Sequence, residues 1–175
     1  MLSASLVASS CAGEFDANGR PRTAFERSIG TCVAAIGLGV LVDVLTNKKR
    51  IGAGTIAGGA VCAVVMVLNN EQDKKRIHDS QVAAYTKGRS TTDTYVGTDG
   101  ARRTVHNDVQ AIPTPVAFSN GAQVTKNGVT YVGPCRKSKT NIEVQGKGNF
   151  EGDSETVCRT ADGDWLPYDT SGSTV

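Results

Sequence analysis

Two kinds of side chain in this 175-residue chain have the chemistry for catalysis or metal binding: five cysteines and two histidines. The histidines are His78, in a highly charged stretch, and His106, beside Asn107 and Asp108. No candidate nucleophile accompanies either of them, so both are predicted to be surface residues. The cysteine spacing contains no CxxC pair and no Cys/His cluster suited to zinc. The sequence therefore predicts no metal site.

Two short stretches resemble ligand loops only superficially. GAGTIAGG at residues 52–59 lacks the GxGxxG spacing of a dinucleotide fold and the Lys-Ser/Thr end of a phosphate loop, and it opens no βαβ unit. TADGDW at residues 160–165 is better explained as a hairpin turn than as a calcium loop. We therefore expect that the protein is not an enzyme, with no catalytic residues and no cofactor.

The first cysteine differs from the other four in its sequence context. The first eleven residues, MLSASLVASSC, are small and apolar and end in Ala-Ser-Ser-Cys. This ending resembles that of a bacterial lipoprotein signal peptide, whose final cysteine is acylated; the alternative is an ordinary Ser-rich N-terminus. We expect lipid attachment at Cys11, with residues 1–11 as a truncated signal and residues 12–27 as a tether. Four cysteines then remain, enough for two bridges in an oxidising compartment.

Charge and hydropathy set limits on the partners. The net charge is only +2, and the 19 Lys and Arg residues are dispersed rather than gathered into a stripe. Nucleic-acid binding is therefore not expected.

Glycine is over-represented with 20 residues, and the apolar residues are concentrated in two runs within the first 70 positions. We expect that the chain does not form one compact core.

The two apolar runs cover residues 28–45 and 51–68 and are joined by TNKKR. Each would span about 27 Å as a helix, just under the hydrocarbon thickness of a bilayer. Small residues recur at four-residue spacing: Thr31, Ala35 and Gly39 in the first run, Gly54, Gly58 and Cys62 in the second, with Gly59 in an adjacent row. Such rows allow close backbone approach, so they predict a glycine-zipper antiparallel helical hairpin over residues 28–69. A flexible Gly-rich segment and a buried helix of a soluble bundle are the alternatives.

Cys32 and Cys62 face each other in that predicted hairpin. Counting outward from the loop places Cys32 opposite the stretch around Cys62. The two residues are expected either to form a disulfide or close thiol pair, or to be two small buried side chains.

A third helix is predicted over residues 70–88. Asn70 can cap it through Asp73, and Gly88 is a natural stop. Because its residues are strongly charged, we expect a solvated helix.

Residues 89–169 change to short alternating runs, and residues 170–175 are expected to be a disordered tail. Asp-Gly or Asn-Gly pairs at 99–100, 127–128 and 162–163 mark three hairpins, which predict a small antiparallel sheet with Trp165 in its core. A bridge between Cys135 and Cys158 would close a loop of about 24 residues and contribute roughly 3 kcal/mol to its stability. The predicted fold class is therefore α+β, a helical hairpin plus helix followed by a disulfide-bonded antiparallel domain.

Three features in this order resemble one family: the Cys11 signal, the zipper with its EQDKKR helix, and a closing block of paired Cys-Arg residues. The matching residues are 71–76, Cys135-Arg136, Cys158-Arg159, Asp162-Gly163 and Trp165. The chain is similar to the bacterial outer-membrane surface-antigen lipoproteins with a glycine-zipper domain. The resemblance implies an envelope structural protein that is acylated at Cys11 and oligomerises through its helices, with no catalytic residues to carry over.

The leading hypothesis is therefore a non-catalytic, lipid-anchored protein of the bacterial outer membrane that faces the periplasm or the cell surface. Its expected partners are membrane lipid, further copies of itself and envelope proteins. An accessory subunit or binding module of a larger envelope assembly is the alternative. A pore subunit ranks lower because the helices carry no polar ladder.

Overall fold

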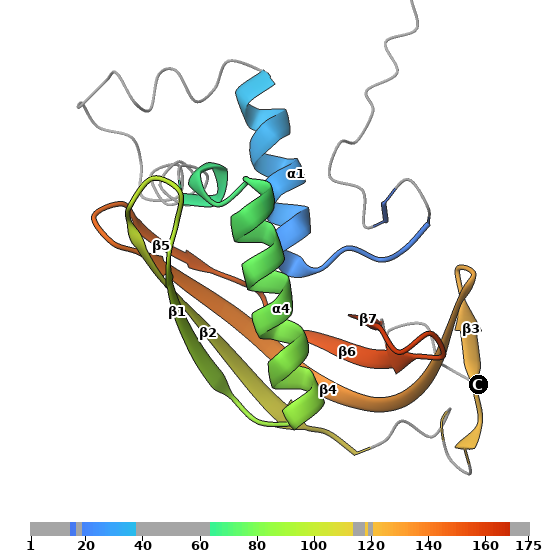
Figure 1. Cartoon of the computed structure of the whole chain (residues 1–175). Coiled ribbons are helices and arrows are strands. Elements are labelled where there is room, and N and C mark those ends of the chain that lie inside the picture. The colour runs from blue at the N-terminus through green and yellow to red at the C-terminus, as the bar shows by residue number, and fades with distance from the viewer. Residues whose placement is uncertain (1–14, 17–18, 38–63, 114–117, 119–120, 169–175) are drawn as a thin grey trace, which may run out of the picture.

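A seven-stranded antiparallel sheet forms the body of the protein, with helices packed on one of its faces (Figure 1). The computed structural model describes residues 15–16, 19–37, 64–113, 118 and 121–168. The described helices are α1 (Ala24–Gly37) and α4 (Glu71–Lys87). The strands are β1 (Thr91–Val96), β2 (Arg102–Ala111), β3 (Val124–Lys126), β4 (Val129–Val144), β5 (Gly148–Glu151), β6 (Glu155–Thr160) and β7 (Trp165–Pro167).

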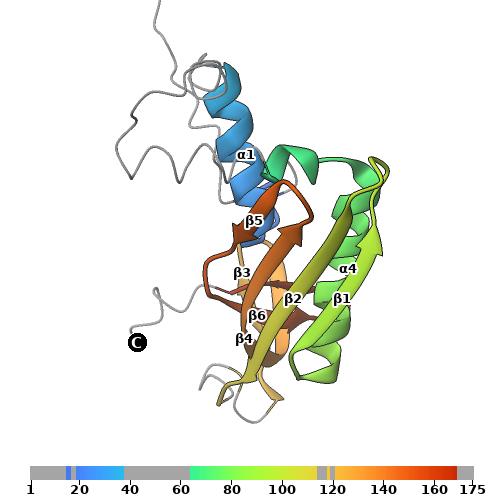
Figure 2. The same ribbon diagram turned by 90° about the vertical axis from the view of Figure 1, so that its left-hand side faces the viewer.

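Strand β4 organises the sheet because it is the longest described strand, with 16 residues, and pairs with four others. The main strand order is β1-β2-β4-β6-β7, and β3 and β5 also pair with β4 (Figure 2). The three hairpins predicted from the sequence are confirmed, since the 99–100 turn joins β1 to β2, 127–128 joins β3 to β4 and 162–163 joins β6 to β7. At the second of these turns Asn127 and Gly128 both have positive φ, as a tight two-residue hairpin requires.

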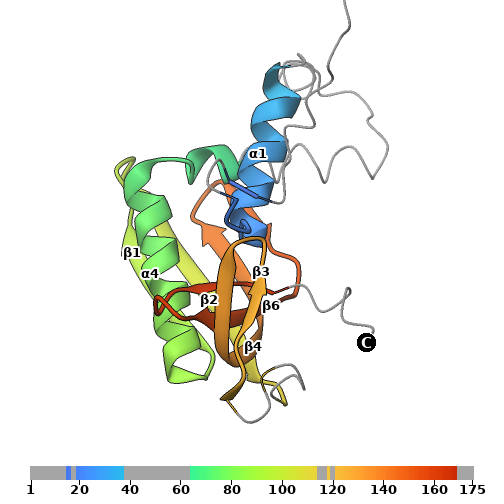
Figure 3. The same cartoon turned by 90° about the vertical axis from the view of Figure 1, so that its right-hand side faces the viewer.

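The two faces of the sheet differ in what covers them. In β2 the side chains of Arg103, Val105, Asn107 and Val109 are buried, while the residues between them are partly or fully exposed. Successive side chains of a strand point to opposite faces, so one face of β2 is covered and the other is open to solvent. Helix α4 lies across the covered face (Figure 3).

Helix α4 is capped as the sequence predicted. The Asn70 side chain accepts a hydrogen bond from the Asp73 backbone N–H, and Gly88 ends the helix in the left-handed conformation. The helix is not solvated on all sides, however, because Ile77, Ala84 and other residues of one face are buried. Its low overall hydropathy concealed this contact, since much of the buried face is polar.

Helix α1 begins at Ala24, within the stretch predicted to be a tether. Thr23 and Glu26 form a capping box: the Thr23 backbone N–H donates to Glu26 Oε2 (2.8 Å), and the Glu26 N–H donates to Thr23 Oγ1 (3.3 Å). The helix packs on the sheet through Phe25, whose ring meets that of Phe150 edge-on with centroids 5.5 Å apart.

The buried apolar side chains of the described residues gather in three clusters. The largest joins α1, residues 64–68 and α4 to the sheet: Phe25, Cys32, Val64, Val65, Leu68, Ile77, Val105, Ile142, Val144 and Phe150. A second lies under the C-terminal half of α4: Ala84, Tyr85, Val109, Val157 and Trp165. A third surrounds the disulfide: Phe118, Tyr131, Cys135, Cys158 and Tyr168. Trp165 is 6% exposed, so its predicted place in the core is confirmed.

The predicted Cys135–Cys158 disulfide is confirmed. The two residues are direct partners in the β4/β6 register, with Cα atoms 4.1 Å apart. Val157, the neighbour of Cys158, packs with Tyr85 of α4, so the disulfide points to the opposite face of the sheet.

The predicted fold class is wrong in its N-terminal half. Most of the described chain is sheet, and no antiparallel helical hairpin is seen in it. Rows of small residues permit close packing but do not choose a partner. The apolar side chains of α1 and of residues 64–68 instead meet sheet residues such as Ile142 and Phe150. Gly39, Gly54, Gly58 and Gly59 lie outside the described residues.

Removing the disulfide tests how much it contributes to stability. The Cys135→Ala/Cys158→Ala variant is expected to lose about 3 kcal/mol of unfolding free energy, because the unfolded chain regains the freedom of the closed loop. Urea unfolding measures this loss. The variant is preferable to a reductant, which would also reduce the disulfide of Cys32. A loss below about 1 kcal/mol would contradict the expectation.

The docking of α1 predicts a pH dependence. Glu155 accepts hydrogen bonds from the Ala24 N–H (3.1 Å) and from Arg27 (3.4 Å), and its burial raises the pKa of its carboxyl from 4.5 to about 7 against the attraction of Arg27. Between these values the folded state holds a proton that the unfolded chain has released. The unfolding free energy should therefore fall by up to about 3 kcal/mol as pH rises from 4.5 to 7.

Urea unfolding at several pH values compares the wild type with Glu155→Gln, which still accepts the Ala24 hydrogen bond but does not titrate. The variant should show a flatter profile through this window. Subtracting the two profiles cancels the contributions of all other titratable groups, because both proteins contain them. Identical slopes would show that Glu155 does not cause the dependence.

Candidate functional site

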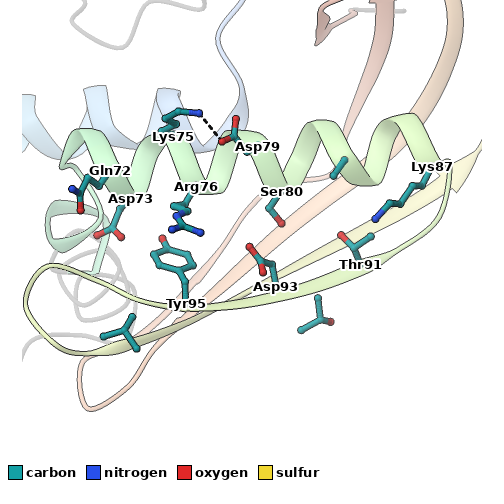
Figure 4. A pocket seen from close by; sticks show the side chains of 13 residues that line it. Gln72, Asp73, Lys75, Arg76, Asp79, Ser80, Lys87, Thr91, Asp93 and Tyr95 are labelled. Atoms are coloured by element: carbon teal, nitrogen blue, oxygen red, sulfur yellow. Dashed lines mark hydrogen bonds and ion pairs between the residues drawn. The ribbon is translucent and has the colours of Figure 1, made fainter.

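A groove of about 710 Å³ runs between α4 and the edge strand β1 (Figure 4). The helix contributes Arg76 and Lys87 to its lining, and the strand contributes Thr91, Asp93 and Tyr95. Odd-numbered residues of β1 point toward α4, because they share a face with the buried residues of β2.

The hydrogen-bond register shows which backbone groups of β1 are committed to the sheet. Gly97 N–H donates to the Ala101 carbonyl (3.0 Å), and Gln145 N–H donates to the Arg102 carbonyl (2.9 Å). Bonding alternates along an antiparallel pair, so residues 91, 93 and 95 bond to β2. The residues between them direct their backbone groups away from it.

Strand β1 therefore presents a row of backbone donors and acceptors at the edge of the sheet. These groups belong to Thr92, Thr94 and Val96, and no described strand pairs with that side. The strand contains neither lysine nor proline, residues that commonly protect an edge. Val96 is 66% exposed and is one of two exposed large apolar side chains among the described residues.

Two kinds of exposed charge line the groove: Lys75 and Asp79 of α4 pair with each other (2.8 Å), and three further charges, Arg76, Lys87 and Asp93, alternate in sign along it. The Arg76 guanidinium lies over the Tyr95 ring, 5.9 Å from its centroid. Lys87 extends toward Thr91, and Asp93 lies between these two positions (Figure 4). Neither Arg76, Lys87 nor Asp93 forms an ion pair within the described part of the chain.

A buried arginine bonds to Asp73, one of the residues that line the groove. The Arg103 side chain is 1% exposed and donates to Asp73 of α4 (3.1 Å), to Asp99 of the β1–β2 turn and to the Ala101 carbonyl (2.6 Å). The hydrogen bond from Arg103 lowers the pKa of Asp99 to about 2. Burial raises the pKa of the neighbouring Tyr95 hydroxyl. Both charges of the Asp73–Arg103 pair are thus held away from water.

Gly97 makes room for this arginine. A Cβ atom at Gly97 would lie 2.1 Å from Arg103 Cζ, which is closer than two carbon atoms can approach. Glycine is therefore required here by close packing rather than by backbone angles.

A layer of polar side chains fixes α4 to the sheet. Gln81 Nε2 donates to Thr140 Oγ1 (2.9 Å), which donates to Asn107 Oδ1 (3.0 Å). Asn107 Nδ2 donates to Ser80 Oγ (2.8 Å). All four side chains are buried, so breaking any of these hydrogen bonds would leave a polar group with neither a protein partner nor water to bond to. The layer fixes the position of the helix and thereby the width of the groove.

The Ser138 hydroxyl extends this layer by donating to the Tyr85 hydroxyl (3.2 Å). Burial raises the pKa of Tyr85 to about 12. Tyr85 therefore stays neutral and acts as a structural group.

A constellation on the open face of the sheet resembles a nucleophile with its base. Thr92 Oγ1 lies 3.1 Å from His106 Nδ1, and His106 Nε2 lies 3.9 Å from a Glu143 carboxylate oxygen. The His106 and Glu143 side chains are 38% and 68% exposed. The groove instead opens between β1 and the helix on the other face, so these groups do not form an enclosed reaction site.

The predicted site residues are only partly described. Cys32 is buried and disulfide-bonded, and its partner lies outside the described residues, so the pairing with Cys62 stays a prediction. Thr31 and Ala35 lie in α1. Cys11, Cys62, Gly39, Gly54, Gly58 and Gly59 fall outside the described chain. Within the described residues no helix is long and apolar enough to cross a membrane, and no cluster suits a metal ion.

Sequence reasoning missed the groove. The signals were a predicted strand beginning a few residues after a predicted helix, and an alternation of Thr91, Asp93 and Tyr95 on one side of that strand. These signals indicate a groove only when the helix is known to lie on the side of the strand to which Thr91, Asp93 and Tyr95 point.

Comparison of the chain with protein-family models, curated proteins and solved structures finds no match. The function must therefore be argued from the residues of this chain.

Replacing Arg103 tests the buried ion pair. Arg103→Met is expected to cost about 3–5 kcal/mol of unfolding free energy, because Asp73 would remain buried without its partner. Arg102→Met, at the adjacent exposed position, is the matched control and should change stability by less than about 0.5 kcal/mol. Chemical denaturation measures both. Equal effects of the two substitutions would argue against the pair.

Proposed function

We propose that the protein is a non-catalytic, lipid-anchored structural component of the bacterial cell envelope, attached to the outer membrane through Cys11. The observation that carries this proposal is the disulfide between Cys135 and Cys158. Disulfides persist in oxidising compartments and are rare in the cytosol, so the bond supports export of the chain. The disulfide of Cys32 supports the same compartment.

The N-terminal signal supplies the means of attachment. Residues 1–11 resemble the end of a lipoprotein signal peptide, and the family resemblance of the chain supports the same role. Acylation would make Cys11 the first residue of the mature protein.

Chain length limits the distance between such an anchor and the domain. Phe15 pairs with Pro21 in an isolated bridge, and Arg20 forms an ion pair with Asp164 in the β6–β7 turn (2.5 Å). Phe15 is four positions after Cys11, a stretch that spans at most about 14 Å. An acylated Cys11 would therefore hold this part of the domain close to the bilayer.

Self-association is the second part of the proposal. The row of small residues at Gly54, Gly58 and Gly59 would permit close approach of another copy of the chain. The proposed protein is thus a homo-oligomer that presents its disulfide-bonded sheet from the membrane.

The alternative function is a binding module of a larger envelope assembly. The exposed edge of β1 beside the charged groove favours it. The two functions are compatible, because an anchored protein can also bind a partner.

Intact mass of the protein from the membrane fraction tests the anchor. We expect a chain that begins at Cys11 and is heavier than its polypeptide by lipid chains. Cys11→Ser should lose this added mass and leave the membrane fraction, whereas Cys135→Ala/Cys158→Ala should keep its lipid and remain there. A wild-type chain that starts at Met1 without lipid would refute the proposal.

A further inference from the structure

We propose that the groove between α4 and β1 binds an extended segment of a partner protein, which pairs with β1 as an additional strand and carries an acidic-x-basic-x-acidic pattern. The inference goes beyond the anchoring function and does not depend on it.

The backbone of β1 provides the pairing groups. Thr92, Thr94 and Val96 direct their N–H and C=O groups away from β2, as the register shows. An extended peptide satisfies such groups by forming a ladder with them. The six residues of β1 span about 20 Å, which accommodates a five-residue strand.

The side chains of the groove determine the pattern. In a paired strand, alternate residues lie opposite Thr91, Asp93 and Tyr95 and point toward α4. Lys87 lies beside the first position and Arg76 beside the third, so each favours a carboxylate (Figure 4). The middle position faces the Asp93 carboxylate and favours a lysine or arginine.

The groove is held in a fixed geometry before a partner arrives. The Asp73–Arg103 pair and the hydrogen bonds of Gln81 and Asn107 fix α4 over the sheet. A preformed site costs little reorganisation on binding. An extended segment therefore has both a backbone edge and an ordered set of charges to recognise.

The experiment uses the full chain in detergent and two synthetic peptides with blocked ends. The first, TEVKVET, has the proposed pattern, and the second, TKVEVKT, reverses every charge. The pattern is the same in both chain directions, so the test does not depend on whether the strand pairs parallel or antiparallel. We expect calorimetric titration to show at least tenfold tighter binding of the first peptide. Hydrogen exchange at the amides of Thr92, Thr94 and Val96 should slow on binding.

Variants separate the backbone and charge contributions. Thr94→Pro removes one outward N–H that bonds no other strand, and it should abolish binding, whereas Thr94→Val keeps this N–H and should still bind. Arg76→Glu/Lys87→Glu should lose its preference for TEVKVET. Both charged side chains are exposed, so these changes leave the core intact.

Several results would overturn the proposal. These are no binding of TEVKVET at millimolar concentration, equal affinity for the two peptides, or unchanged binding by Thr94→Pro. Protection of the β1 amides that rises with protein concentration without peptide would show that a second copy occupies the edge, which also overturns it. None of these readouts depends on acylation of Cys11, so failure here is distinguishable from failure of the anchoring proposal.

Discussion

The buried ion pair between Arg103 and Asp73 is the constraint on which the rest of the structure depends. A guanidinium that is 1% exposed must find its partners inside the protein, because no water can replace them. Its partners come from α4 and from the β1–β2 turn, so the pair joins these elements at one place. Gly97 provides the space for the side chain. The edge strand and the helix are thereby held apart at a fixed distance, and the groove follows from that separation.

Apolar and polar contacts have different roles beneath α4. The apolar clusters around Ile77 and around Ala84 remove hydrocarbon from water and supply a non-directional driving force. The polar layer of Gln81, Thr140 and Asn107 lies on the same helix–sheet contact and is directional, since each bond has one partner at one distance. A helix shifted along the sheet would leave several buried groups unsatisfied. The apolar contacts thus favour docking, and the polar contacts select its register.

The segment that follows the proposed anchor contacts the sheet at the edge opposite the proposed binding edge. Arg20 joins the N-terminal segment to the β6–β7 turn, and the strand order places β7 and β1 at opposite edges. A lipid at Cys11 would hold the β7 side near the bilayer within the reach of four residues. The edge of β1 would then remain accessible to a partner. The disulfide between Cys135 and Cys158 joins β4 to β6 between these two edges.

The sequence by itself determined the local features. These are the caps of α4 at Asn70 and Gly88 and the three hairpin turns, since each depends on residues close together in the chain. The pairing of Cys135 with Cys158, which joins the non-consecutive strands β4 and β6, was favoured by the stability that closing its loop adds. Only the tertiary structure decided which surface the helices cover. The pattern of small residues predicted helix against helix, but the sheet provided the partner, and the polar face of α4 concealed its burial. The groove likewise required the tertiary structure, because its charges come from two elements whose relative position no local pattern specifies.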